Sequence, residues 1–176
     1  MTKSLLAIAT VAVTAVGLAL AAGTASATSG AHFFSATSSV VLSGSQQGAL
    51  QVSWDEAGVG QSQVDYTLHA DASATYACIN GGGNHPKAAN KQSVNGPLDV
   101  PATPFLSENG RVVGSLTTGP LASNLTCPNG QTFVLACVSY SNIVLTDITN
   151  NVSTADRREP HIANVNHTFV NIGPPC

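Results

Sequence analysis

The stretch Leu50-Gln51-Val52-Ser53-Trp54 alternates apolar and polar residues at every step, and Val64-Asp65-Tyr66-Thr67-Leu68 repeats the pattern. Successive side chains of a β-strand point to opposite faces of its sheet, so this alternation predicts half-buried strands with Trp54 in the core. Further segments are rich in strand-forming residues and bounded by Gly, Pro, Asn and Ser. These segments are residues 38–43, 75–79, 111–117, 133–140, 142–148 and 166–172.

Four Asn-Gly pairs, at 80–81, 95–96, 109–110 and 129–130, predict tight turns, because this pair readily takes positive φ angles. The clearest hairpin spans residues 105–116. No segment after residue 27 carries a helical stripe, and residues 86–92 could form one short helical turn at most. Many short strands without interleaved helices predict an all-β fold, an antiparallel β-sandwich of the immunoglobulin-like kind.

Composition and charge exclude several classes of protein. The 176 residues suffice for one domain, and only 9% of them are charged. Six Lys and Arg against nine Asp and Glu give a net charge of −3, which argues against a nucleic-acid partner.

The start of the chain has the pattern of a secretory signal peptide, residues 1–27. Lys3 supplies the positive charge, residues 5–22 form an uncharged apolar run, and Ala25-Ser26-Ala27 is a small-residue cleavage site. We therefore expect a secreted, extracellular protein with a single domain, residues 28–176. No later apolar run is long enough to span a membrane, so we expect no membrane insertion after cleavage.

All four cysteines lie in this exported part, at Cys78, Cys127, Cys137 and Cys176. An even number of cysteines in an oxidising compartment predicts two disulfides. Three pairings are possible, of which we favour Cys78–Cys127 together with Cys137–Cys176. The spacings of 49, 10 and 39 residues do not fit a zinc site.

The segments YACINGGGNHPK at 76–87 and VSYSNIVLTD at 138–147 resemble small secreted proteins of actinomycetes and filamentous fungi. The resemblance covers most of the exported chain and implies a secreted single domain. No activity is attached to that group, so the resemblance implies no functional residue.

A second cleavage site, Ser29-Gly30-Ala31, would make His32 the mature N-terminus. The α-amine and ring of such a histidine, with one more histidine, form the copper site of secreted polysaccharide monooxygenases. The candidates for the second histidine are His69, His161 and His167. Cleavage after Ala27 would instead leave His32 an ordinary residue at the start of the first strand.

The segment 80–91 is the longest polar stretch and holds a local positive cluster. Loops of this kind carry binding functions on rigid sandwiches. The candidate ligand-binding residues are Asn84, His85, Lys87, Asn90 and Lys91.

Asp55 and Glu56 are adjacent, so a strand would point them to opposite faces and they do not form a glycosidase pair. We expect them to begin a solvated turn. No nucleophile-elbow or zinc-protease motif is present. The sequence thus favours a non-enzymatic extracellular or cell-surface binding module that uses no cofactor and whose ligand is unidentified. The alternatives are a copper-dependent oxidative enzyme and a structural coat or matrix protein.

Overall fold

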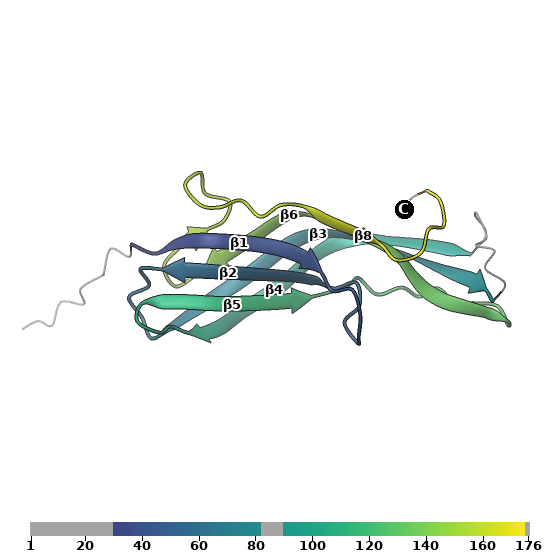
Figure 1. Cartoon of the computed structure of the whole chain (residues 1–176), viewed down its shortest axis with the longest axis horizontal. Coiled ribbons are helices and arrows are strands. Elements are labelled where there is room, and N and C mark those ends of the chain that lie inside the picture. The colour runs from purple at the N-terminus through teal and green to yellow at the C-terminus, as the bar shows by residue number, and fades with distance from the viewer. Residues whose placement is uncertain (1–29, 82–89, 175–176) are drawn as a thin grey trace, which may run out of the picture.

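The computed structural model describes residues 30–81 and 90–174, which form strands and no helix (Figure 1). None of these residues therefore belongs to a helix that could cross a membrane. The strands are β1 (His32–Val40), β2 (Leu50–Ala57), β3 (Gln63–Asn80), β4 (Lys91–Leu106), β5 (Arg111–Thr118), β6 (Gln131–Asp147), β7 (Val152–Ser153) and β8 (Val165–Thr168).

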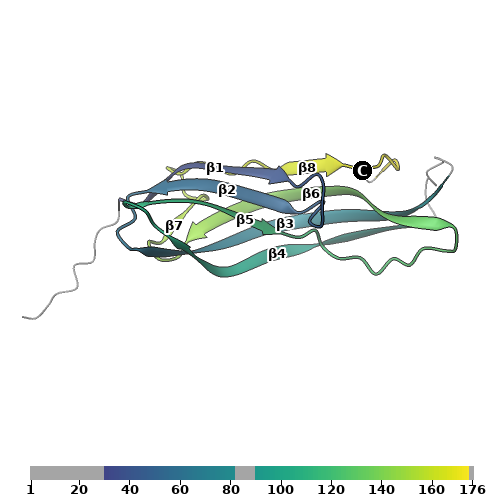
Figure 2. The same cartoon turned by 60° about the horizontal axis from the view of Figure 1, so that its bottom comes forward.

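The strands form two antiparallel sheets that lie face to face (Figures 1 and 2). The short sheet has the order β1-β2-β5. The long sheet has the order β4-β3-β6-β7, and β8 also pairs with β6. The long strands β3, β4 and β6 continue well beyond the end of the short sheet (Figure 2). The predicted all-β, two-layer antiparallel architecture is confirmed.

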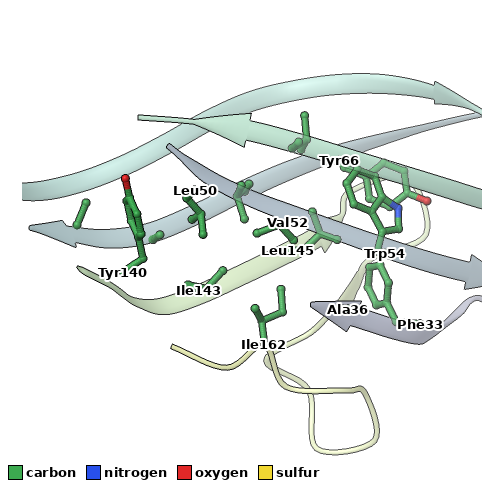
Figure 3. Close-up of a cluster of buried hydrophobic side chains, with 14 of the residues drawn as sticks. Phe33, Ala36, Leu50, Val52, Trp54, Tyr66, Tyr140, Ile143, Leu145 and Ile162 are labelled. Atoms are coloured by element: carbon green, nitrogen blue, oxygen red, sulfur yellow. The ribbon is translucent and has the colours of Figure 1, made fainter. Parts of the chain in front are cut away.

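The core lies between the two sheets, where the alternating apolar residues of β2 and β3 meet (Figure 3). Trp54 is only 2% exposed, as predicted, and its ring lies 4.8 Å from Tyr66 and 4.9 Å from Phe105. Gly114 of β5 faces this ring so closely that a Cβ atom there would lie 2.5 Å from Trp54 Cζ2. The glycine is needed because the indole occupies the space of a side chain.

Three of the four predicted Asn-Gly pairs lie at strand ends as expected, and the first of them ends β3, with Asn80 as its last residue and Gly81 in the turn that follows. Asn109 and Gly110 have φ of 53° and 75° and join β4 to β5, which confirms the predicted hairpin. Gly130, with φ of 82°, precedes β6. The prediction for Asn95-Gly96 is wrong, because both residues lie inside β4 and pair with β3.

Strand β4 itself was not among the predicted segments, since it contains Pro97, Pro101 and Pro104. Proline cannot donate a backbone hydrogen bond and is therefore confined to strands at the edge of a sheet. β4 is such an edge, since it pairs along its length with β3 alone. Its prolines are thus compatible with a strand of 16 residues.

The predicted disulfide between Cys78 and Cys127 is present, with Cα atoms 5.4 Å apart. It links the far end of β3 to the coil that precedes β6. In the same region the Tyr76 hydroxyl donates to the Leu121 carbonyl at 2.6 Å. Cys176, the predicted partner of Cys137, lies outside the described residues.

Candidate functional site

The predicted binding loop is described only at its end, because Asn84, His85 and Lys87 lie outside the described residues. The Asn90 side-chain amide donates to Gln131 Oε1 at 2.8 Å. Lys91 Nζ donates to two carbonyls of the C-terminal segment, those of Ile172 and Pro174. These contacts join the start of β4 to its neighbours, so the Asn90 amide nitrogen and the Lys91 ammonium group already donate hydrogen bonds within the chain.

The four candidate copper ligands lie on different elements. His32 opens β1 and its Nδ1 lies 2.7 Å from the Gly30 carbonyl oxygen. His69 is on β3, His161 is in the coil between β7 and β8, and His167 is on β8. Among the described residues no three or more His, Cys, Asp and Glu side chains are grouped to hold a metal ion. The copper hypothesis stays a prediction.

The outer face of the long sheet carries short polar side chains in register across four strands. Ser73 of β3 pairs with Asn95 of β4 and with Ser139 of β6. Ser139 in turn pairs with Asn166 of β8. In the neighbouring row Thr75 pairs with Ser93 of β4 and with Cys137 of β6, and Cys137 pairs with Thr168 of β8. Thr75 is only 2% exposed, and its hydroxyl lies 2.9 Å from that of Ser93. We call the set the polar face: Ser73, Thr75, Ser93, Asn95, Ser139, Ser141, Asn166 and Thr168.

Strand periodicity explains why these side chains point outward. Ala72 and Ala74 of β3 are buried in the core, so the residues that alternate with them face the other way. Two depressions of about 370 and 240 Å³ lie on the polar face and share Ser73 and Ser139 in their walls. The two depressions therefore adjoin and form one shallow groove across the strands. Hydroxyl groups can donate and accept hydrogen bonds without carrying charge.

A cluster of polar and charged side chains, His69, Asp71, Asp99 and Asn142, bounds the polar face at one end. Asp99 Oδ1 lies 2.7 Å from His69 Nδ1, and Asp71 Oδ1 lies 3.9 Å from His69 Nε2. The Asn142 amide donates to Asp71 Oδ2 at 2.6 Å. The imidazole of His69 thus lies between two carboxylates, and one of them, Asp71, also lines the larger depression of the groove and pairs with Ser141.

Sequence reasoning missed the buried carboxyl group of Glu56. The expected solvated turn is wrong, because β2 continues to Ala57 and places the Glu56 side chain fully inside the core. Its Oε2 accepts a hydrogen bond from the Tyr66 hydroxyl at 2.6 Å, while its Oε1 has no hydrogen-bond partner in the described part of the chain. The sequence signal for this burial was the period-two alternation of β2, since position 56 continues the buried series of positions 50, 52 and 54.

Burial raises the pKa of Glu56 to about 8, because an ionised carboxylate loses its hydration inside the protein. The hydrogen bond from Tyr66 acts in the opposite direction, and the nearby carboxyls of Asp147 and Glu159 raise the pKa further. The same burial and the neighbouring carboxyl raise the pKa of the Tyr66 hydroxyl. Glu56 is therefore largely protonated at neutral pH, and it affects the stability of the core rather than an exposed site.

Apart from the buried Thr75, the side chains of the polar face and those around His69 share one exposed side of the molecule, whereas Glu56 is enclosed between the sheets. Of these features, only the exposed ones can contact a ligand without opening the core. The chain matches no protein-family model, no curated protein and no solved structure.

Proposed function

We propose that the protein is a secreted, non-enzymatic binding module that holds a hydroxyl-rich ligand, such as a polysaccharide, on its polar face. The observation that carries the proposal is the row formed by Asn95, Ser73, Ser139 and Asn166 across four paired strands. Uncharged groups that both donate and accept match the hydroxyl groups of a sugar chain. The proposal requires no cofactor and assigns no catalytic step.

The rigidity of the support favours such binding. Short side chains on paired strands have few rotamers to lose, so less conformational entropy opposes binding. Neighbouring strands lie about 4.8 Å apart, so a row of four side chains spans roughly 14 Å. A ligand that contacts the whole row must therefore be extended, which favours a polymer over a single sugar.

An extracellular setting is part of the proposal. It is supported by the signal pattern of residues 1–27 and by the disulfide between Cys78 and Cys127. We also propose a second disulfide between Cys137 and Cys176 and an immunoglobulin-like topology. The strand order β1-β2-β5 facing β4-β3-β6-β8 supports that topology.

Co-sedimentation with insoluble cellulose, chitin and peptidoglycan tests the proposal. The double variant Ser73→Ala/Ser139→Ala removes two hydroxyls from adjacent strands. Each lost hydrogen bond is worth about 1 kcal/mol, so binding should weaken roughly thirtyfold. The matched control is Ser53→Ala/Ser115→Ala, a cross-strand pair on the short sheet, which should bind as the wild type does.

Two results would contradict the proposal. One is that no polysaccharide retains the wild-type protein at any concentration tested. The other is that the two double variants lose affinity equally, because the polar face would then have no special part in binding. Intact mass before and after reduction with alkylation tests the second disulfide separately.

A further inference from the structure

The short sheet has one covered edge and one open edge. At the β1 edge, Ser38 Oγ donates to the Ala163 carbonyl at 2.6 Å and the Phe33 amide donates to Glu159 Oε2 at 2.7 Å. At the opposite edge β5 pairs along its length with β2 alone. An open edge presents unpaired backbone groups that can accept another strand.

The hairpin fixes which backbone groups of β5 point outward. Arg111 exchanges two backbone hydrogen bonds with Glu108, at 3.0 and 2.9 Å, so its N–H and C=O point away from β2. The direction of the backbone N–H and C=O groups alternates along a strand. The backbone groups of Val113, Ser115 and Thr117 therefore also point away from β2. In the described part of the chain, no hydrogen bond satisfies the backbone groups of these three residues.

The two open edges on this side of the molecule differ in chemistry. β4 carries three prolines, which hinder the addition of another strand. β5 has no proline, and residues 112–118 carry no charge. Val113 and Leu106, at 73% and 76% exposed, line a groove of about 570 Å³ beside the start of β5. Of the two edges, β5 is the one that presents free backbone groups without proline, and the exposed side chains of Val113 and of Leu106, the last residue of β4, lie beside its start.

We propose that β5 pairs antiparallel with β5 of a second copy of this chain, about a two-fold axis at Ser115. In this register Val113 of one copy lies opposite Thr117 of the other, and Ser115 lies opposite itself. The three outward residues of each copy then exchange about six backbone hydrogen bonds. The two short sheets become one continuous sheet, and this self-association goes beyond the proposed binding function.

Self-complementarity makes the second copy the occupant of this edge. The outward residues are evenly spaced about Ser115, so a two-fold axis satisfies all of them at once. No like charges meet, because Arg111 is the only charged residue of β5 and lies at its end. It is also paired with Asp55 within its own chain.

Sedimentation velocity over a range of protein concentrations tests the proposal, together with amide exchange in the same samples. We expect a reversible dimer and at least tenfold slower exchange of the Val113, Ser115 and Thr117 amides in the dimer than in the monomer. The amides of Val112 and Leu116 point toward β2 and serve as internal controls. They should be protected at every concentration.

Two variants target the edge. Val113→Lys places a charge on an exposed position and Ser115→Pro removes an outward donor, and each should raise the dissociation constant at least tenfold. Ser53→Lys, on the same face of the central strand, is the matched control and should still dimerise. A protein that stays monomeric at millimolar concentration, or folded edge variants that dimerise like the wild type, would overturn the proposal.

Discussion

Replacing Glu56 by Gln should remove a pH dependence of stability that this buried carboxyl group creates. In the unfolded chain the group has its ordinary pKa of 4.5, and in the folded protein burial raises the pKa to about 8. Between these values the folded state binds a proton that the unfolded state has released. Stability therefore falls as pH rises through this window.

The size of this loss of stability follows from the difference between the pKa of Glu56 in the unfolded chain and its pKa in the folded protein. Each pH unit between the two pKa values is worth about 1.4 kcal/mol, so the full window amounts to about 5 kcal/mol. Between pH 5 and pH 7 the wild-type protein should lose about 3 kcal/mol through Glu56 alone. Glu56→Gln is neutral at every pH and retains an oxygen that can accept from the Tyr66 hydroxyl, so it should lack this loss.

Urea unfolding at a series of pH values measures the effect. Trp54 is the only tryptophan and is buried, so its fluorescence reports loss of the core. With a slope of about 1–3 kcal/mol per molar urea, the wild-type midpoint should fall by roughly 1–3 M between pH 5 and pH 7. All other titratable residues are the same in both proteins, so the difference between the two curves isolates Glu56.

Parallel curves for the two proteins would refute this reasoning, as would a wild-type stability that rises from pH 5 to pH 7 through Glu56. Either result would mean that water or a rearranged side chain solvates the carboxylate inside the folded protein. The comparison requires that the free energy of unfolding depend on urea concentration with the same slope in both proteins. Equal slopes show that the two proteins expose the same surface on unfolding.

Three further substitutions test the packing. Gly114→Ala should lower the free energy of unfolding by about 1–3 kcal/mol, because its methyl group would lie 2.5 Å from Trp54, and an unchanged urea midpoint would contradict this. Tyr140→Phe removes a hydroxyl that donates at 2.6 Å to a carbonyl of the β1–β2 loop, and should cost about 1–2 kcal/mol in the same assay. Replacing Cys78 and Cys127 together by Ala should cost about 4 kcal/mol for a separation of 49 residues, and thermal unfolding equal to the wild type would show that this loop closure stabilises nothing.

Local alternation was sufficient to predict that residues 50–54 and 64–68 form strands that face the core. The pattern around Trp54 and Tyr66 reports which side of each strand is buried, and both residues lie in the core. The pattern failed for β4, where Pro97 and its fellow prolines read as loop residues. Whether such a segment is a strand depends on its being the edge of a sheet, which only the tertiary arrangement decides.

Polar residues were harder to place, because the sequence of a strand does not reveal what covers its outer face. Ser73 and Ser139 are 66 positions apart and become neighbours only through the pairing of β3 with β6. The Asn-Gly pair at 95–96 and the polar stretch 80–91 stand out by local composition alone. The polar face has no such local signal, since each of the four strands contributes only two short side chains to it.

The buried carboxyl group of Glu56 shows most clearly why the environment of a residue must be known before its chemistry is assigned. Its position in the alternation of β2 predicts that it points inward, but not that it is protonated there. Protonation depends on the loss of water around Glu56 and on the nearby carboxyls of Asp147 and Glu159, which lie about a hundred positions further along the chain. A glutamate at the end of an exposed strand would keep its ordinary pKa, so the contact between the two sheets, and not the residue type, makes this group sensitive to neutral pH.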